Sequence, residues 1–230
     1  MNPLTITSNM YNERHQLEDW FKFVNQIADG GVLIVDNGST DGTIEYARSQ
    51  GAIVIEDDII VREGYGPARN HLREMTRKHF PKSKWMAYFD GDERMLPKDF
   101  HQLRFLKEYL EPEWDVIAFP RIDWYDYEMT TAANNWTVAP DWQARMTRID
   151  SPLKYVRRLH EQLMDHNKIL CELTNPILHH LHRATTQSKR DYIGRLCAKL
   201  HGEDEEWGHT YPKHHKEDFY KKQLEENNGI

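Results

Sequence analysis

The sequence predicts an α/β protein built on a mostly parallel sheet with helices on both faces. Over the first half of the chain, short apolar runs typical of buried strands alternate with segments whose apolar residues recur at helical spacing. Glycine-containing turns separate the two kinds of segment, as in βαβ units with right-handed crossovers. The 230 residues are enough for one such domain with a sizeable core.

The predicted strands are short runs rich in valine, isoleucine and other apolar residues. They lie at residues 4–7, 32–35, 52–55, 85–89 and 115–120. Because most of these runs are continuously apolar rather than alternating, we expect both of their faces to be buried beneath helices.

The predicted helices occupy the segments between these strands. They lie at residues 17–28, 43–50, 67–79 and 100–110. In the first, Leu17, Trp20, Phe21 and Val24 recur three and four positions apart, which is the spacing of one helix face. Glycines follow the first two helices, and a Gly-x-Gly-Pro turn opens the third.

The regular alternation fades after residue 120. The segment from there to residue 185 is rich in tryptophan, tyrosine, asparagine and arginine, and long connections of this kind are usually functional. Its aromatic residues form either a wall on which a sugar stacks or a partly buried patch; they are Trp124, Tyr125, Tyr127, Trp136 and Trp142. From residue 186 the chain turns polar, and we expect a surface helix followed by a solvated end.

Composition and charge exclude several classes of protein. Hydrophobic residues make up 39% of the chain, the mean hydropathy is −0.82, and no apolar run approaches the roughly 18 residues of a membrane span. The net charge of −7 argues against a broad nucleic-acid-binding surface. Two cysteines are too few for a disulfide framework, and the N-terminus shows no secretory signal, so we expect a cytoplasmic protein.

Three carboxylates follow the predicted strand at 85–89 within four positions. They are Asp90, Asp92 and Glu93, and like charges this close are unfavourable unless a cation or a basic side chain neutralises them. One interpretation is a metal site. The other is that the acids cap the helix that Pro97 opens, since carboxylates favour helix N-termini.

Two further motifs lie where the predicted sheet would place a ligand. Asp36, in "VDNGSTDGT", also follows a strand, so it should project into the same crevice as Asp90, where an acid accepts hydrogen bonds from a ribose or a base. "GYGPARN" places Arg69 and Asn70 early in a helix. It is either an ordinary helix entry or a phosphate site, because a guanidinium suits phosphate oxygens.

Taken together, these motifs resemble glycosyltransferase family 2. The likeness rests on "SNMYNE", "VDNGSTDGT", "GYGPARN", "FDGDERMLP", "PDWQARM" and "HE", and their order and spacing are similar to those of bacterial lipopolysaccharide-core glucosyltransferase-like members. The resemblance covers residues 4 to about 195. Its most specific parts are "VDNGSTDGT" and the strand that leads into "DGDER".

The resemblance implies a GT-A fold with a Rossmann-like sheet. Residues 1–185 would form the glycosyltransferase domain, with a nucleotide-sugar-binding half at 1–120, an acceptor half at 121–185 and a helical, polar tail at 186–230. It also implies an inverting, metal-dependent transfer from a nucleotide-diphosphate sugar, UDP-sugar first, to a hydroxyl of a glycan or glycolipid. Mn²⁺ or Mg²⁺ would be the cofactor, and a membrane acceptor would require peripheral contact.

The resemblance assigns roles to individual residues. The nucleotide-sugar site would contain Asn12, Glu13, Asp36, Arg69, Asn70 and Asp90. The metal would be held by Asp92 directly, with Asp90, His160 and His179 as further ligands. Asp141 is the first choice for the base that takes the acceptor proton, and Glu161 is the second.

Further expectations concern the histidines of residues 177–183 and the acid cluster. In "ILHHLHR" the histidine and arginine of the family pattern match His179 and Arg183, and strand alternation places His180 and His182 on the opposite face. A histidine-rich zinc site stays open as an alternative. We also expect Glu93 and Arg94 to form a supporting ion pair.

Other functions stay open at this stage. A glycosyltransferase acting on a modified nucleic-acid base would use local basic segments such as "KYVRRLH". Nucleotidyl transfer would need a glycine-rich basic loop after the first strand, where this chain has "SNMYNE". A non-catalytic nucleotide-sugar-binding module would not need the three acids Asp90, Asp92 and Asp141.

Overall fold

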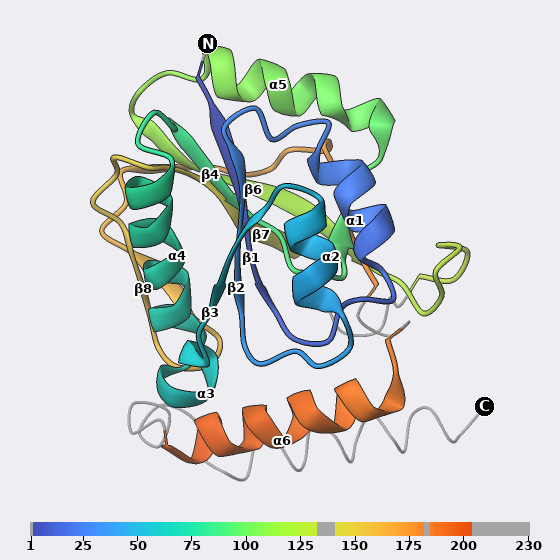
Figure 1. Cartoon of the computed structure of the whole chain (residues 1–230). Helices are drawn as coiled ribbons and strands as arrows, with labels where there is room; N and C mark the ends of the chain where they lie inside the picture. Colours follow the sequence, from blue (N-terminus) through green and yellow to red (C-terminus); the bar gives the residue numbers. More distant parts are fainter. Residues whose placement is uncertain (1, 133–140, 182–184, 204–230) are drawn as a thin grey trace, which may run out of the picture.

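The computed structural model confirms an α/β fold, and it describes residues 2–132, 141–181 and 185–203. A central sheet is flanked by helices on both faces (Figure 1). The strands are β1 Leu4–Met10, β2 Gly31–Asp36, β3 Ile53–Glu56, β4 Trp85–Tyr88, β5 Glu93–Arg94, β6 Trp114–Asp123, β7 Asp141–Arg148, β8 Lys154–Val156, β9 Gln162–Met164, β10 Lys168–Leu170 and β11 Leu178–His180. The helices are α1 Leu17–Val24, α2 Thr43–Ser49, α3 Ile59–Glu63, α4 Tyr65–His79, α5 Phe100–Tyr109 and α6 Gln187–Glu203, with a 3₁₀ turn, η1, at Pro97–Asp99.

The first half of the sheet is parallel, as predicted. Its strands lie in the order β3-β2-β1-β4, and every neighbouring pair runs in the same direction. Met10 of β1 lies opposite Asp36 of β2, so the carboxyl ends of these two strands are level. Because α1, α2 and α4 form the crossovers, this edge of the sheet gathers the loops that follow each strand.

The second half of the sheet is mixed. Strand β7 inserts between β4 and β6 and runs antiparallel to both, whereas β11 pairs in parallel with β6 and antiparallel with β5. The sheet therefore continues past the predicted parallel strands by using segments from the irregular region after residue 120. This arrangement brings β11 beside the two-residue strand β5 that carries Glu93.

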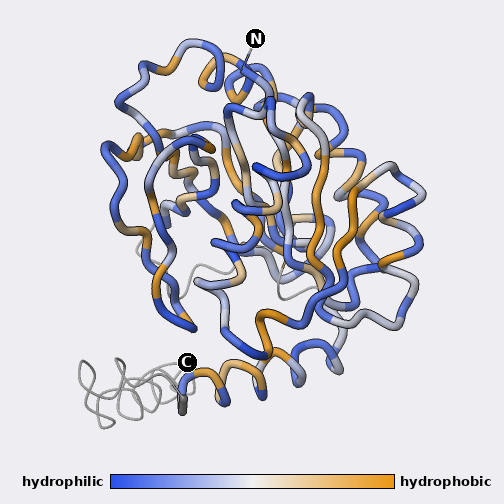
Figure 2. Tube along the Cα trace, turned by 60° about the vertical axis from the view of Figure 1, so that its left-hand side comes forward, coloured by the Kyte–Doolittle hydropathy of each residue, from blue (hydrophilic) through white to orange (hydrophobic). Residues whose placement is uncertain are grey.

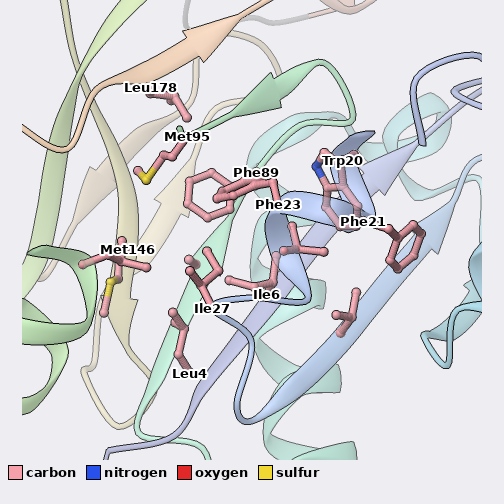
Figure 3. Packing of buried hydrophobic residues seen from close by; sticks show 14 of the residues in the cluster. Leu4, Ile6, Trp20, Phe21, Phe23, Ile27, Phe89, Met95, Met146 and Leu178 are labelled. Atoms are coloured by element: carbon pink, nitrogen blue, oxygen red, sulfur yellow. The ribbon is translucent and has the colours of Figure 1, made fainter. Parts of the chain in front are cut away.

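Side-chain alternation along the strands builds two cores. In β2, Ile34 packs in the larger core with α1, and Leu33 and Val35 pack on the opposite face with α4. Figure 3 shows the larger core, where Trp20, Phe21 and Phe23 of α1 meet side chains of the strands. Strand β2 is apolar from residue 32 to residue 35, and Figure 2 shows hydrophobic strand segments inside the fold. Burial on both faces explains why the sequence of β2 does not alternate.

Helix α6 lies across the carboxyl ends of the parallel strands (Figure 1). The sequence predicted a surface helix here, and the structure forms a helix over Gln187–Glu203 with one face buried. Leu196 and Leu200 belong to the same core as Leu33 and Val35. Within the described residues, no helix is both long enough and apolar enough to cross a membrane.

Candidate functional site

A cavity of about 160 Å³ lies between the carboxyl edge of the sheet and α6. Its lining comes from the ends of β1, β2 and β4, from α3 and the start of α4, from the end of β11 and from α6. The lining residues are Asn9, Met10, Tyr11, Glu13, Asn37, Ile60, Tyr65, Tyr88, Asp90, Asp92, His180, Lys189, Tyr192, Ile193 and Leu196. The crevice that the sequence predicted is therefore present, and helix α6 forms one of its walls.

Two of the three clustered acids are neutralised by a basic residue from a distant strand. Arg145 of β7 places Nη2 2.6 Å from Glu93 Oε1 and 3.4 Å from Asp90 Oδ2, and its Nε donates to Glu93 Oε2 at 2.9 Å. Glu93 and Arg145 are both buried. Burial alone would lower the pKa of Arg145, but Glu93 and Asp90 outweigh it and raise this pKa above its ordinary value.

Arg145 corrects two expectations about the acid cluster. Glu93 does not pair with Arg94, because neighbouring residues of a strand point to opposite faces, and Arg94 instead lies 3.6 Å from Asp19. The capping interpretation is not supported either: neither η1 nor α5 has a side-chain cap hydrogen bond. The acids are arranged around Arg145 and the cavity, not around a helix end.

Asp92 faces a histidine of β11. His180 Nε2 lies 3.6 Å from Asp92 Oδ1, and its Nδ1 lies 2.6 Å from Asp123 Oδ1. Burial lowers the pKa of His180, but Asp92, Asp123 and Glu93 outweigh it and raise the pKa to about 10. In the absence of a ligand, a protonated His180 is thus the local countercharge of Asp92.

Glu13 pairs with a lysine of α6. Lys189 Nζ contacts Glu13 Oε1, and Gln16 Nε2 donates to Glu13 Oε2 at 2.7 Å. Burial raises the pKa of Glu13 to about 7, and Asp92 adds to the rise, whereas Lys189 opposes it. Next to this pair, the rings of Tyr11 and Tyr192 stack with their centroids 4.0 Å apart. These contacts hold α6 against the end of β1.

Asp36 and Asn12 are engaged in the turn between β2 and α2. Asp36 Oδ1 accepts from the backbone N–H groups of Gly38 and Ser39 at 3.0 and 2.7 Å, and its Oδ2 accepts from Ser39 Oγ at 2.7 Å. Asn12 Oδ1 accepts from the backbone N–H of Thr40 at 2.9 Å. Burial raises the pKa of Asp36, while the hydrogen bonds from Ser39 and Gly38 oppose the rise. In this conformation, both side chains hold the turn.

Arg69 and Asn70 both contact the segment that follows β7. Arg69 is buried, pairs with Glu161 and lies 4.0 Å above the ring of Tyr88. Asn70 Nδ2 donates to the Tyr155 carbonyl at 2.7 Å, and the Tyr155 N–H donates to Asn70 Oδ1 at 2.9 Å. Neither residue lines the cavity. The structure thus joins Arg69 and Glu161, to which the sequence had given separate roles.

The glycines of "GYGPARN" allow residues 156–158, which follow β7 in the chain, to come close to the start of α4. A Cβ on Gly66 would lie 2.3 Å from the Arg157 carbonyl oxygen, and one on Gly64, whose φ is +95°, would lie 2.5 Å from the Arg158 carbonyl oxygen. The Gly66 N–H donates to that Arg157 oxygen at 3.1 Å. In this structure the two glycines are therefore required for close packing of the backbone, because a larger side chain at either position would collide with it.

Asp141, the expected base, lies at the start of β7. Arg121 Nη2 lies 2.7 Å from Asp141 Oδ2, and Gln143 Nε2 donates to Asp141 Oδ1 at 2.8 Å. Arg121 Nε also lies 3.4 Å from Asp123 Oδ1. Because Asp123 contacts His180, a chain of charged side chains connects Asp141 to the cavity.

The two histidines expected to bind metal lie elsewhere. His160 is exposed and is not among the residues that line the cavity. His179 accepts at Nδ1 from Trp124 Nε1 at 3.0 Å and stacks on the Trp124 ring. Strand alternation in β11 turns His180 toward Asp92 instead. Arg183 and His182 lie outside the described residues.

The aromatic segment does not form one continuous wall among the described residues. Tyr127 donates from its hydroxyl to Gln16 Oε1 at 3.3 Å, and Trp142 donates from Nε1 to the Leu173 carbonyl at 3.3 Å. Tyr125 and Trp142 remain exposed. Trp136 lies outside the described residues.

The cavity residues that sequence reasoning missed include His180, Lys189 and Tyr192. For His180 a signal existed, because alternation separated the two neighbouring histidines, but it did not tell which face meets Asp92. Lys189 and Tyr192 lie in a segment whose polar composition indicated a solvated helix. The alignment of Leu196 and Leu200, four positions apart on that helix, was the available sign of a buried face.

The chemistry of the lining residues fits a hard divalent cation. Among the described residues, no group of three or more His, Cys, Asp and Glu side chains is arranged to hold a metal ion. Mg²⁺ and similar ions are commonly bound by one or two carboxylates together with substrate phosphates and water, not by an all-protein cage. Asp92, with Asp90 and His180 beside the same cavity, supplies such a partial set.

Comparison with known protein families decides which group the chain belongs to. Residues 8–169 match the family described as "Glycosyl transferase family 2". The chain is a member of glycosyl transferase family 2. The matched region contains the motifs around Asp36, Asp92 and Asp141, and it ends before α6. A search of curated proteins finds no match.

Solved structures show the GT-A fold for this family member. The crystal structure of S. aureus TarS 1–349 in complex with UDP is 14% identical, has a TM-score of 0.52, and covers 93% of this chain and 68% of that one. A longer TarS structure is 15% identical, with a TM-score of 0.52, over 83% of this chain and 38% of that one.

A glucosyl-3-phosphoglycerate synthase from Mycobacterium tuberculosis, in a complex with Mn²⁺ and UDP, is 18% identical, with a TM-score of 0.42. That match covers 53% of this chain and 44% of the synthase. The present chain thus spans well under two thirds of the length of the synthase and of the longer TarS structure.

Proposed function

We propose that this family 2 member is a metal-dependent, inverting glycosyltransferase that uses a nucleotide-diphosphate sugar, with a UDP-sugar as the first candidate donor. The observation that carries the proposal is the position of Asp92. This carboxylate lies past the carboxyl end of β4, lines the cavity and faces His180 across 3.6 Å. The fold that the chain shares with TarS, whose structure was solved with UDP, supports UDP as the nucleotide.

Asp92 and His180 would hold the cation, which would be Mn²⁺ or Mg²⁺. Carboxylate oxygens suit both ions, and His180 would coordinate through Nε2 only after losing the proton there. A bound cation would offset the negative charge that develops on the leaving diphosphate. Asp90 would contact the donor or share the cation, and Asp123, which contacts His180 Nδ1, would orient the imidazole. His180 takes the place that the sequence gave to His179.

The base is a carboxylate that accepts the proton of the acceptor hydroxyl. As that oxygen bonds to the anomeric carbon, the bond from this carbon to the diphosphate oxygen breaks on the opposite side, which inverts the configuration. Asp141 stays the first choice, because Arg121 and Gln143 orient its carboxylate. Glu161 is the second choice, since its pairing with Arg69 must loosen before it accepts a proton.

The acceptor would be a hydroxyl of a glycan or glycolipid. The exposed rings of Tyr125 and Trp142, which lie on the segment that carries Asp141, provide apolar faces on which a sugar can stack. A nucleic-acid acceptor is the weaker alternative, because the chain is acidic overall. A non-catalytic nucleotide-sugar-binding module would keep the cavity without the need for an oriented Asp141.

Donor turnover tests the proposal. The protein is incubated with a panel of nucleotide sugars and candidate acceptors, with Mn²⁺ or with EDTA, and the release of nucleotide diphosphate is followed. We expect release from one donor, its loss in EDTA and its loss in Asp92→Ala, whereas the exposed-surface control Glu113→Ala retains it. Release that persists in EDTA would contradict the metal requirement. Donor binding without turnover on any acceptor would instead favour the non-catalytic module.

A further inference from the structure

Helix α6 contributes a basic residue to the cavity. Lys189 lies in the first turn of α6, its side chain is 5% exposed, and its Nζ contacts Glu13. Among the residues that the structure describes, it is the one lysine or arginine in the cavity lining. It also lies outside residues 8–169, the region that matches the family. Its role therefore has to be inferred from its surroundings in this chain.

A donor diphosphate bound in the cavity would need a positively charged side chain of the protein beside it. The acidic lining residues of the cavity are Glu13, Asp90 and Asp92, and a donor diphosphate would bring additional negative charge into the same space. Arg145 contacts Asp90, His180 contacts Asp92 and Lys189 contacts Glu13, so each of these acids already has a basic neighbour. A diphosphate brings charge that these pairs and one divalent cation do not fully offset, and a lysine ammonium binds phosphate well as a point charge.

The arginine that the sequence assigned to the diphosphate does not reach this space. Arg69 pairs with Glu161, lies over the Tyr88 ring and is absent from the lining. Tyr88, on whose ring the Arg69 guanidinium lies, is a lining residue, whereas Arg69 is not. In this conformation, Lys189 is the residue that offers a long basic side chain to a ligand in the cavity.

The position of Lys189 within α6 is unfavourable for the helix itself. The first turn of α6 has no acidic residue, and Lys189 is followed there by the basic Arg190. Cations at a helix N-terminus oppose the helix dipole, whereas anions are favoured there. Helix stability thus does not explain why a buried lysine stands at this end, whereas its pairing with Glu13 and the binding of an anion in the adjoining cavity both would.

We propose that Lys189 binds the diphosphate of the nucleotide-sugar donor and so makes α6 part of the donor site. The inference rests on the proposed function. An ammonium carries three N–H donors, so Lys189 can keep its contact with Glu13 and donate to a diphosphate oxygen as well. Glu13 would then act as a positioning residue that holds the ammonium toward the cavity. The tail of the chain thereby supplies a contact that the motifs of the matched region lack.

Binding of a nucleotide series tests this role separately from folding. Dissociation constants for UDP, UMP and uridine are measured by calorimetry, with Mn²⁺, for the wild type, Lys189→Met, Lys189→Arg and Lys199→Met. Lys199 is the matched control, because it is an exposed lysine on the same helix whose Nζ donates to the Val61 carbonyl at 3.3 Å.

If Lys189 contacts the diphosphate, Lys189→Met weakens UDP binding by about 10- to 100-fold, the range of a charge-assisted hydrogen bond. Uridine affinity then changes less than about twofold, so the advantage of UDP over uridine shrinks. Lys189→Arg retains most of the UDP affinity, and Lys199→Met matches the wild type.

Two results would overturn the proposal while leaving the proposed function intact: equal weakening of UDP and uridine, or unchanged UDP binding in Lys189→Met. Either would make Lys189 only the counter-ion of Glu13. If Lys189→Met fails to fold because Glu13 is left buried and unpaired, the double variant Glu13→Gln/Lys189→Met removes that charge and repeats the comparison. If the wild type binds neither UDP nor UMP nor uridine, the result would instead contradict the proposed function, and this inference with it.

Discussion

Asp36 and Asp92 both follow a strand of the same parallel sheet, yet their surroundings differ. Asp36 is fully buried, and both of its oxygens accept hydrogen bonds from the turn residues Gly38 and Ser39. Asp92 lines the cavity, and its Oδ1 lies 3.6 Å from His180 Nε2. A carboxylate at a strand end is therefore not by itself a ligand site. The residues around it decide whether it holds the following turn, as Asp36 does, or faces a cavity, as Asp92 does.

The largest effect on stability is expected from replacing Arg145, the residue that neutralises Asp90 and Glu93. Arg145→Met leaves Glu93 buried without its partner, and we expect a loss of about 3–5 kcal/mol in the free energy of unfolding. Urea denaturation measures this loss. The double variant Glu93→Gln/Arg145→Met should recover a good part of it, because no uncompensated charge remains. A single variant as stable as the wild type would show that Arg145 is not needed to neutralise Glu93.

The second prediction concerns the cavity carboxylate. Asp92→Asn keeps the size of the side chain but removes its charge, so we expect donor turnover with Mn²⁺ to fall by about 100-fold or more. Stability should fall modestly, since His180 loses one of its two acidic partners while Asp123 remains. Steady-state kinetics and thermal melting measure the two effects. A folded Asp92→Asn variant with normal turnover would mean that the cation, if required, is bound elsewhere.

The third prediction concerns the turn carboxylate. Asp36→Ala removes three hydrogen bonds to residues 38 and 39, and we expect a loss of about 2 kcal/mol in the free energy of unfolding. Because Asp36 does not line the cavity, the KM for the donor should change less than twofold at temperatures where the variant is folded. A large rise in KM with little loss of stability would indicate that Asp36 contacts the nucleotide.

The smallest effect is expected at Asn70. Its side chain pairs with the backbone of Tyr155 through two hydrogen bonds, so Asn70→Ala should cost about 1–2 kcal/mol of stability. Asn70→Asp keeps the acceptor but loses the donor, and we expect an intermediate value. Urea denaturation of both variants, with donor KM measured in parallel, tests whether Asn70 is structural or a donor contact.

Local patterns in the sequence predicted the first half of the fold well. Apolar runs and glycine turns identified β1 to β4 and the helices α1, α2 and α4, because burial on two faces and helical periodicity act over a few residues. The short helix α3 was not predicted. The insertion of β7 between β4 and β6 was not predicted. Strand order in that half depends on pairing between residues far apart in the chain, and no local period encodes it.

The sequence predicted where the candidate site lies and that it is acidic, but not which side chains pair with one another there. The motif around Asp92 pointed to the cavity, but it could not choose between His179 and His180, since the choice depends on the register in which β11 pairs with β5. Nor could it assign Glu93 to Arg145, which is 52 residues away in the chain. The pairing of Arg69 with Glu161 likewise depends on the close approach at Gly64 and Gly66. Such contacts are set by tertiary structure.

The packing of α6 has a practical consequence for where the chain can be cut. A fragment that stops at residue 185, where the polar composition begins, would lose Leu196 and Leu200. It would remove these two side chains from the cluster that also contains Val35 and Ile60, and would leave part of that apolar surface uncovered. Newly exposed aliphatic surface of this kind promotes aggregation. Fragments for crystallisation or labelling should therefore extend at least through residue 203, and an affinity tag belongs beyond α6.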